Sequence, residues 1–373
     1  MTAATTTGRS TTTPVRVRPM QAGEEPTVRA IAARAFDPFD RLLFSTRGRE
    51  TLVAVTDDDR PVGAVVLHAT GGGRLGPLGV VHFIFADPDV RIPGIGTALR
   101  DAADARFVEL GCTETSARID AVNSASQALH RSGGYRPVPV REQLRRWGWR
   151  LPQRWRQAGH GFDPGMQLWL RPAPTDTPAP ATWTRVATTA AINLALLLIV
   201  AWRAPRGDVG PGALLSTLAG TLTVLIGLRE AAIRLVARRQ HLDLSHTPWV
   251  NGVGLGGLLA GAVGVWLPLT GSSIPDRAGW RYDREVARLG RAHLAGALTV
   301  AGLAWSAVLF TPEVGAIAWG EVRRAAVMLA LIDLVAGFSP FIGTAARHVR
   351  AWSTTAWVAI ALLGLGPFLL TLA

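Results

Sequence analysis

The pattern of apolar and polar positions changes character near residue 172. Before that point, apolar residues occur in short β-type runs separated by helical patterns and turn residues. The runs predict strands at Val15–Arg18, Thr51–Val55, Val62–Leu67, Val80–Ala86, Thr113–Ile119, Arg136–Arg141 and Met166–Arg171. Helical spacing of apolar residues predicts helices at Glu24–Phe36, at Ser124–Arg131 and around Leu99, Ala103, Phe107 and Leu110. Strands interleaved with helices predict an α/β domain.

The rest of the chain is dominated by long apolar stretches. Each is close to the length needed to cross about 30 Å of hydrocarbon. They lie at Val186–Trp202, Gly212–Leu228, Leu294–Phe310, Ala325–Ile342 and Ala356–Leu372. A further stretch, Trp249–Leu267, is similarly apolar but rich in glycine. We therefore expect an all-α, polytopic membrane domain with five spans and a doubtful sixth.

Segments of different composition flank the first domain. Met1–Thr13 is rich in threonine and alanine without an apolar core, which predicts a disordered leader and not a signal peptide. Arg171–Ala181 is rich in proline and predicts an extended linker. The predicted boundaries are therefore a leader at 1–13, a first domain at 14–172, a linker at 173–185 and a membrane domain at 186–373.

The composition supports a membrane location. The chain has 373 residues, 48% of them hydrophobic, and a formal charge of +12 that comes entirely from arginine, because it contains no lysine. A basic excess favours anionic lipid or nucleic acid as a partner. The many apolar stretches favour the lipid bilayer, so no nucleic-acid partner is expected. The single cysteine, Cys112, excludes an intramolecular disulfide and fits a reducing compartment.

The segment Val80–Leu110 carries the clearest chemical signal. An apolar run ends at Asp87 and Pro88, and the glycine-containing turn Arg91–Gly96 follows it before a helical pattern begins. Backbone N–H groups at such a helix start point outward and can hold a phosphate. The turn glycines let the backbone approach the ligand closely, and Arg91 adds a permanent charge with a geometry suited to phosphate.

Two motifs in this domain resemble those of the GNAT acetyltransferase family. Arg91–Gly96 resembles the acetyl-CoA-binding signature (R/Q)-x-x-G-x-(G/A), and Asn123–Tyr135 resembles the next element, N-x-x-A-x-x-L-Y-x-x-x-G-(F/Y). The resemblance covers about residues 14–172 and implies a mixed, mostly antiparallel sheet with helices on both faces. It implies acetyl-CoA as co-substrate, held by Phe85, Ala86, Arg91, Ile92, Pro93, Gly94, Ile95, Gly96, Thr97 and Asn123.

The same resemblance implies a reaction. In the family, an acceptor amine attacks the thioester directly, with backbone N–H groups near Phe85–Ala86 as the corresponding oxyanion donors here. The family's usual acid for the departing thiolate is a tyrosine, and His130 stands at the matching position. Histidine can donate a proton, or the difference can mark a domain that only binds acetyl-CoA. For the general base we expect His82, ahead of Asp87 and Asp89, although a strand histidine is more often structural.

Tryptophans and arginines alternate in Glu142–Gln157. One interpretation is an interfacial segment, in which arginines meet lipid headgroups and indole rings lie at the boundary. The other is a loop over the acceptor site whose tryptophans pack on the domain. Pro152 is expected to interrupt any helix here, and a nucleic-acid patch ranks below both interpretations.

The membrane half resembles the intramembrane metalloproteases of the site-2 protease family. The segment Arg229–Ile233 corresponds to H-E-x-x-H with both histidines replaced, and Leu331–Gly343 corresponds to N-x-x-P-x-x-x-L-D-G, with Asp333 and Phe341 at key positions. Catalytic zinc needs three protein ligands, so we expect neither a metal nor proteolysis. Asp333 should face the bundle, since exposure to lipid costs about 3 kcal/mol. Glu230 is expected in a surface ion pair.

These observations predict a multi-pass protein of the cell membrane with a cytoplasmic N-acetyltransferase domain and an amine acceptor of unknown identity. If Trp249–Leu267 dips into the membrane without crossing, the arginines at 277–291 stay on the cytoplasmic side, as the positive-inside rule favours. The alternatives are a non-catalytic acetyl-CoA sensor that regulates its membrane domain or a partner, and a transporter or channel with a regulatory domain.

Overall fold

The structure is a computed structural model that describes residues 15–71, 73–161, 165–172, 181–203, 210–275, 277, 279–310, 316–337 and 344–372. The expected leader, most of the expected linker, and Phe341 with the end of the span expected at 325–342 lie outside the described residues. The chain divides into two compact units. Unit 1 comprises Met1–Arg118, Leu129–Arg136 and Trp169–Pro174; unit 2 comprises Ile119–Ala128, Pro137–Leu168 and Thr175–Ala373.

Seven strands form one sheet in the order β1-β2-β3-β4-β5-β7-β6. Their bounds are β1 Arg16–Pro19, β2 Glu50–Val55, β3 Pro61–Thr70, β4 Leu78–Ala86, β5 Glu114–Asp120, β6 Arg136–Pro137 and β7 Met166–Arg171. Strands β1 to β4 pair antiparallel, and β4 pairs with β5 in parallel. Because a parallel pair needs a crossover, a helix lies between β4 and β5 in the chain. The mixed sheet expected from the sequence is confirmed.

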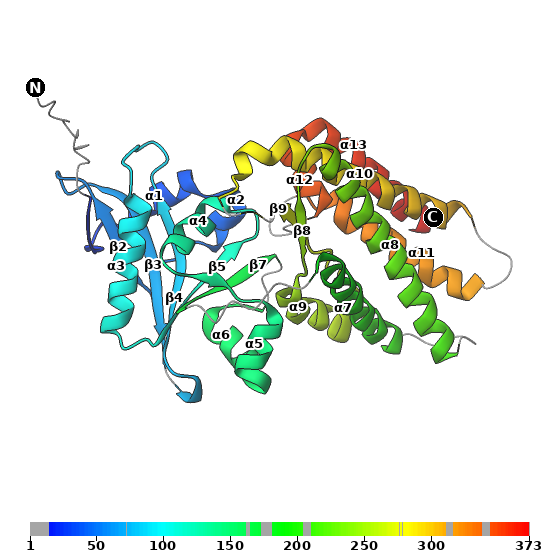
Figure 1. Cartoon of the computed structure of the whole chain (residues 1–373), viewed down its shortest axis with the longest axis horizontal. Helices are drawn as coiled ribbons and strands as arrows, with labels where there is room; N and C mark the ends of the chain where they lie inside the picture. Colours follow the sequence, from blue (N-terminus) through cyan, green and yellow to red (C-terminus); the bar gives the residue numbers. More distant parts are fainter. Residues whose placement is uncertain are drawn as a thin grey trace, which may run out of the picture. The chain divides into compact units, whose positions relative to one another are not determined.

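Helices cover both faces of this sheet in unit 1 (Figure 1). They are α1 Glu25–Ala35, α2 Pro38–Leu43 and α3 Ile95–Glu109, with the turn η1 at Gly73–Leu75. On one face, Phe107 of α3 packs where β4 has only a glycine, Gly79. On the other, Val28 and Ile31 of α1 pack with strand valines in a buried cluster. Expected core positions of α3 are buried, but Leu110 caps the helix and is 37% exposed.

The strand expected at Arg136–Arg141 is wrong beyond its first two residues. Strand β6 ends at Pro137, and helix α5, Val140–Trp147, begins three residues later. Proline cannot donate to a strand ladder but is suited to the start of a helix. For the same reason Pro152 stands in the first turn of a second helix, α6 Leu151–Ala158, after the turn η2 at Gly148–Arg150.

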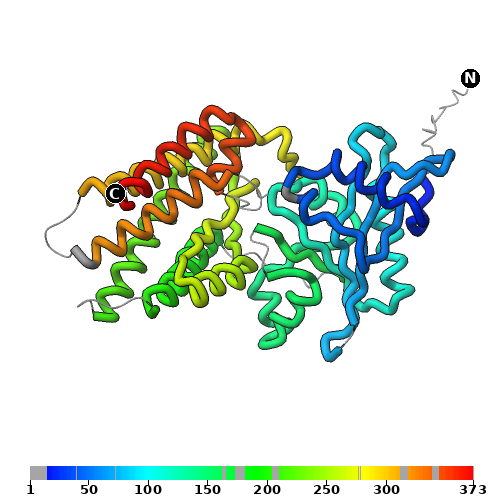
Figure 2. Tube along the Cα trace, turned by 180° about the vertical axis from the view of Figure 1, so that it is seen from behind, coloured from blue at the N-terminus to red at the C-terminus, as the bar shows by residue number. Residues whose placement is uncertain are grey.

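Unit 2 is mainly helical. Its helices beyond α5 and α6 are α7 Thr182–Arg203, α8 Pro211–Arg239, α9 Val253–Leu258, α10 Tyr282–Leu309, α11 Ala316–Ala330, α12 Ala345–Trp352 and α13 Thr354–Leu372. Four of them, α7, α8, α10 and α13, are long and apolar enough to cross a membrane by length and composition. In Figures 1 and 2, α10 runs beside α8, α11 and α13, as their contacts also show.

Two of the expected membrane elements differ from the structure. The span expected at Ala325–Ile342 is instead α11, which begins at Ala316 and ends in a π-helical turn, η5 Leu331–Val335. The glycine-rich stretch forms η3 Val250–Gly252, α9 and η4 Leu259–Val263, which together are too short to count among the four long helices. The sequence also gave no sign of strands β8 Leu244–Thr247 and β9 Ser272–Pro275, which pair antiparallel.

Candidate functional site

The turn between β4 and α3 has the geometry of a ligand-binding helix start. Gly94 is the N-cap of α3 at φ +89°, a conformation that favours glycine, and a Cβ there would meet nothing within 4 Å. The N–H of Ala98 donates to the carbonyl of Gly94 at 2.9 Å. The N–H groups of Ile95, Gly96 and Thr97 come before this bond, in the first turn of the helix. The N–H groups of a first turn have no acceptor within the helix.

Helix α4, Ser124–Ser132, is tied to α3 beside this turn through its C-terminal half. Arg100 of α3 donates to the carbonyl of Leu129 at 2.6 Å and to the hydroxyl of Ser132 at 2.7 Å. A Cβ built on Gly96 would touch Leu129 at 3.4 Å, which is ordinary contact. The fold of unit 1 therefore tolerates a small side chain at Gly96, so a requirement for glycine there would come from a ligand.

Strands β4 and β5 separate at the end of β4 that leads to this turn. Their parallel pairing runs over four positions and ends at Val81 and Ala117. At the same point β4 carries a bulge, since Val81 pairs with Leu67 and Phe83 with Val66 of β3, leaving His82 between them. Beyond the bulge, β4 continues to Ala86 with β3 as its ladder partner. We call this end of the β4–β5 pairing, beside the backbone of Phe85 and Ala86, the opening between β4 and β5.

The strand register places several basic side chains on the α1 face of the sheet next to this opening. Residues paired directly across strands share a face, so His68 of β3 lies on the same face as Val80 and Ser116. Arg118 is two residues after Ser116 in β5 and therefore lies on this face as well. The ring of the bulged His82 lies 6.2 Å from the ring of His68. Arg49, the residue before β2, lies on the same face by alternation from Thr51.

These basic neighbours depress the basicity of His82. Burial is the main cause that lowers the pKa of His82 to about 3, followed by the charges of Arg49, Arg118 and His68. His82 is therefore neutral at physiological pH, which is the form a general base requires, but it is a weak base as it stands. His82 was expected here from the sequence, whereas Arg49, Arg118 and His68 were not, because strand alternation assigns a face only once the register is known.

The expected acid, His130, is buried on α4 with 1% of its surface exposed. Its ring packs edge-on against Tyr135 at 5.2 Å. Tyr135 is fully buried, as expected for a core aromatic, and its hydroxyl donates to the Asp104 carboxylate at 2.5 Å. Burial raises the pKa of Tyr135, and the charge of Asp104 raises it further. The tyrosine is thus held in its protonated form close to the expected histidine.

The remaining expected residues fall into different environments. Arg91 is exposed in the turn, and Ile95 is buried beneath it. The side chain of Asn123 caps α4 by accepting a hydrogen bond from the N–H of Ser126 at 3.0 Å, as expected for a cap. Asp87 and Asp89 both pair with Arg34 of α1, at 2.5 and 3.2 Å, and Arg34 lowers the pKa of Asp87. The lowered pKa makes Asp87 a poor base.

The segment rich in tryptophan and arginine shares features of both expected interpretations. Trp147 is buried beneath the guanidinium of Arg154, and the indole N–H of Trp155 donates to Gln143 at 2.7 Å. Trp149, in contrast, is 82% exposed, with the guanidinium of Arg150 over its ring. Two tryptophans therefore hold α5 and α6 together, and one is free to meet a surface.

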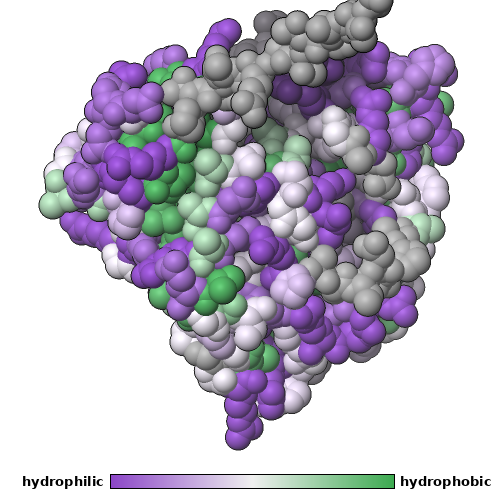
Figure 3. All heavy atoms as spheres, turned by 60° about the vertical axis from the view of Figure 1, so that its left-hand side comes forward, coloured by the Kyte–Doolittle hydropathy of each residue, from purple (hydrophilic) through white to green (hydrophobic). Residues whose placement is uncertain are grey.

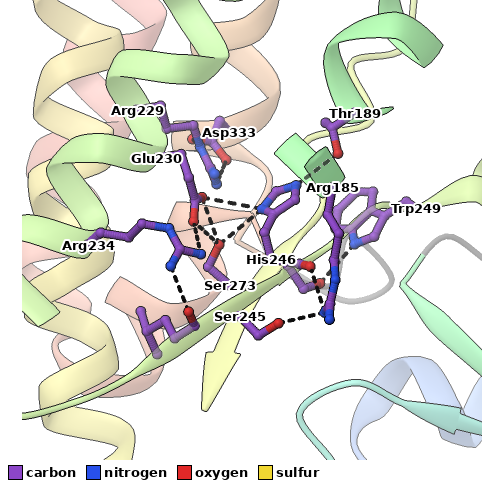
Figure 4. Close-up of polar contacts among 12 residues, drawn as sticks. Arg185, Thr189, Arg229, Glu230, Arg234, Ser245, His246, Trp249, Ser273 and Asp333 are labelled. Carbon is purple, nitrogen blue, oxygen red and sulfur yellow. Dashed lines mark hydrogen bonds and ion pairs between the residues drawn. The ribbon is translucent and has the colours of Figure 1, made fainter. Parts of the chain in front are cut away.

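Unit 2 contains a buried polar cluster that joins α7, α8, β8 and β9 (Figure 4). The hydroxyl of Ser273 donates to the Glu230 carboxylate at 2.8 Å, and Arg234 pairs with the same carboxylate at 2.8 Å. The ring of His246 contacts Glu230 at 3.3 Å through Nδ1 and Thr189 at 2.8 Å through Nε2. Glu230 thus forms an ion pair as expected, but the pair is buried and not at the surface. Its neighbours in sequence do not reveal that residues of β8 and β9 contact it.

Asp333 faces the bundle as expected, and the structure identifies its partner. Arg229 forms two hydrogen bonds with the Asp333 carboxylate, at 2.7 and 2.9 Å, and both side chains are buried. The N–H of Ala345, at the start of α12, donates to the same carboxylate at 2.9 Å. The charges of this cluster are therefore matched, and its contacts join α8, η5 and α12.

Comparison with known proteins bears on the first half of the chain. Residues 20–135 match the family model described as the acetyltransferase (GNAT) family. No curated protein matches the chain significantly. Similar solved structures include a nourseothricin acetyltransferase (21% identity, TM-score 0.28, covering 34% of this chain and 85% of that one). A second is a GNAT family acetyltransferase from Elizabethkingia anophelis with acetyl-CoA bound (15% identity, TM-score 0.27, covering 33% of this chain and 77% of that one). A third is a Bacillus subtilis acetyltransferase in complex with CoA (14% identity, TM-score 0.30, covering 42% of this chain and 97% of that one).

The family model covers strands β2 to β5 of the mixed sheet, the end of the β4–β5 pairing and the glycine-capped helix α3. The family model ends at residue 135 and leaves the helical region that follows without an assignment. Residues 20–135 thus form a domain of the GNAT acetyltransferase family.

Proposed function

We propose that the protein is a membrane-anchored N-acetyltransferase that transfers the acetyl group of acetyl-CoA to an amine. The observation that carries this proposal is the helix start at Gly94–Thr97, which lies beside the opening between β4 and β5 in the region that matches the family model. Its outward N–H groups and Arg91 suit the pyrophosphate of acetyl-CoA. The four long apolar helices supply the anchor.

The residues of unit 1 support a direct transfer. The neutral amine attacks the thioester carbonyl, the N–C bond forms, and the C–S bond breaks as the tetrahedral oxyanion collapses. Backbone N–H groups beside Phe85 and Ala86 stabilise that oxyanion. A proton leaves the nitrogen, towards His82 or water, and His130 gives a proton to the departing thiolate. His82 lies on β4 where the pairing with β5 ends, and His130 follows Leu129, which lies beside Gly96 of the turn.

A charge placed in the turn tests acetyl-CoA binding. Gly96→Glu puts a carboxylate against the pyrophosphate and should abolish binding, while Gly96→Ala, which the neighbouring Leu129 accommodates, keeps the fold. Gly71→Glu is the matched control, because its Cβ would meet nothing within 4 Å and it lies outside the turn. Isothermal titration of the purified full chain with acetyl-CoA measures the change. Equal affinity of Gly96→Glu and the wild type refutes the site.

The second candidate function is an acetyl-CoA sensor that regulates its membrane domain or a partner. The replacement of the family's tyrosine by a buried histidine, His130, favours it. A sensor binds acetyl-CoA tightly and releases no CoA with any amine, whereas the enzyme releases CoA in proportion to amine. In either case we propose that the acetyltransferase domain is cytoplasmic, where acetyl-CoA is found, and that a reporter fused after Ala373 lies on the other side of the membrane.

A further inference from the structure

The first half of helix α4 belongs to unit 2 and its second half to unit 1. Unit 2 includes Ile119–Ala128, the end of β5 and the start of α4, whereas Leu129–Arg136, which contains His130, is part of unit 1. The helix runs without a break from Ser124 to Ser132. Because intrahelical hydrogen bonds fix each residue relative to the preceding turn, contacts that orient the start of α4 also orient the turn that carries His130.

Asp120 organises the turn that leads into α4. Its carboxylate accepts a hydrogen bond from the N–H of Val122 at 2.8 Å, and its backbone carbonyl accepts one from the N–H of Asn123 at 3.0 Å. The side-chain amide of Gln127, on the first turn of α4, donates back to the carbonyl of Ala121 at 2.7 Å. The turn and the helix start are therefore joined by hydrogen bonds, and a shift of Asp120 is passed on to α4.

Two residues that are distant in the chain bind this turn within unit 2. The guanidinium of Arg347, on α12, donates to the second carboxylate oxygen of Asp120 at 3.0 Å, across 227 positions of sequence. The N–H of Tyr282, the first residue of α10, donates to the hydroxyl of Ser124 at 3.0 Å, across 158 positions. Because the first N–H groups of a helix have no acceptor within it, Ser124 caps α10. The start of α4 is thus tied to the starts of α10 and α12.

Apolar packing surrounds the same turn. Ala121 and Val122 are buried in one cluster with Leu289 and Ala292 of α10 and with Ile233 of α8. Apolar burial is non-directional, so it holds the turn against these helices without fixing its orientation. Hydrogen bonds are directional, and those between charged groups are the stronger ones. The charged hydrogen bond from α12 is therefore the contact that orients the turn.

We propose that Arg347 is a positioning residue for acetyl transfer: it holds Asp120, and through the turn and α4 it sets the place of His130. This inference rests on the proposed function, in which His130 gives a proton to the departing thiolate. A proton donor must come within hydrogen-bond reach of its acceptor, and a misplacement of about 1 Å can cost about 10²-fold in rate. The phosphate-binding turn lies at the start of α3, so the affinity for acetyl-CoA should not depend on Arg347.

The variant Arg347→Gln tests this role in the full-length protein in detergent. CoA release is measured with acetyl-CoA and with spermidine, tyramine, glucosamine or glycinamide as the amine. We expect kcat to fall by roughly 10–100-fold, while the affinity for acetyl-CoA, measured by isothermal titration, stays within about twofold of the wild type. Arg347→Lys keeps a positive charge opposite Asp120 and should recover most of the lost kcat.

A partner variant and a matched control separate positioning from a loss of packing. Asp120→Asn keeps an acceptor for the N–H of Val122 but weakens the contact with Arg347, so it should lower kcat to the same extent. The double variant should be no worse than either single variant, because both changes remove one contact. The control is Arg350→Gln, because Arg350 lies one turn further along α12 and donates to the carbonyl of Gly337 at 3.3 Å. This control should keep the wild-type kcat.

Hydrogen–deuterium exchange follows the physical step without any acceptor. Arg347→Gln should speed amide exchange in peptides that cover residues 122–129, whereas Arg350→Gln should leave it unchanged. Unchanged exchange there, or a normal kcat, in Arg347→Gln overturns the inference alone. A wild type that binds acetyl-CoA but releases no CoA with any of the four amines refutes the proposed enzyme, and with it the role of Arg347.

Discussion

Two regions of the protein, the polar cluster of unit 2 and the surroundings of His82 in unit 1, differ in the charges that they contain. In unit 2, Arg229 meets Asp333 and Glu230 meets Arg234, so each charge in the cluster has a partner of opposite sign. In unit 1, the charges that shift the pKa of His82 come from Arg49, Arg118 and His68, which are cationic or protonatable. Balanced charges in a helical bundle fix the packing of its elements, because each polar group loses its partner if the elements move.

The two units also differ in the hydropathy of their surfaces and in the space around two of their glycines. On the face drawn in Figure 3, which brings the unit 1 end forward, hydrophilic residues cover most of the coloured surface. In unit 2, α8 and α13 expose large apolar residues, among them Leu215, Leu235 and Leu362. Gly94 is open to its surroundings, whereas a Cβ on Gly290 of α10 would collide with Trp352. Gly94 thus leaves the turn accessible, whereas Gly290 permits close packing between α10 and α12.

The largest effect is expected at His130, the proposed acid of unit 1. His130→Phe keeps the ring volume and removes the proton, so kcat should fall by about 10²–10⁴-fold with acetyl-CoA affinity little changed. His130→Tyr restores the residue typical of the family and should retain substantial activity. Stopped-time assays of CoA release measure both variants. Normal turnover of His130→Phe would show that the thiolate takes its proton from water.

In unit 2, the expected consequence is for stability. Asp333→Asn leaves Arg229 buried without its counter-charge and should lower the free energy of unfolding by about 3–5 kcal/mol. The double variant Arg229→Met with Asp333→Leu removes both charges and should recover most of that loss. Thermal unfolding of the purified protein in detergent measures the midpoints. An unchanged midpoint for Asp333→Asn contradicts a role of the pair in packing.

The smallest effect is expected for the acid sensitivity of unit 1. The folded-state pKa of His82 is about 3, below its ordinary value of 6.5. Between those values the unfolded chain binds a proton that the folded chain does not, so folded stability declines as the pH falls below 6.5. His82→Asn should therefore lose less stability than the wild type between pH 6.5 and pH 4. His241→Asn, at an exposed position with φ +54°, is the control and should follow the wild type.

Local sequence was sufficient wherever one segment determines its own geometry. The strand that ends at Ala86, the glycine at the start of α3, and the cap at Asn123 all follow from residues adjacent in the chain. The long apolar helices α7, α8, α10 and α13 follow from length and composition alone. The wrong prediction of a strand at Arg136–Arg141 also has a local origin. Strand β6 ends at Pro137 and helix α5 begins at Val140, so the apolar pattern of one short segment was compatible with either a strand or a helix.

The sequence by itself determined the class of each half of the chain: an acetyltransferase-type α/β domain with its turn at Arg91–Gly96, followed by a helical region with long apolar helices. Only the tertiary structure decided which charges meet. Asp333 and Arg229 are 104 positions apart, and Arg49 and His82 come together through strand register. Hydrophobic periodicity acts within one element, whereas charge pairing depends on long-range contacts that a local pattern does not encode.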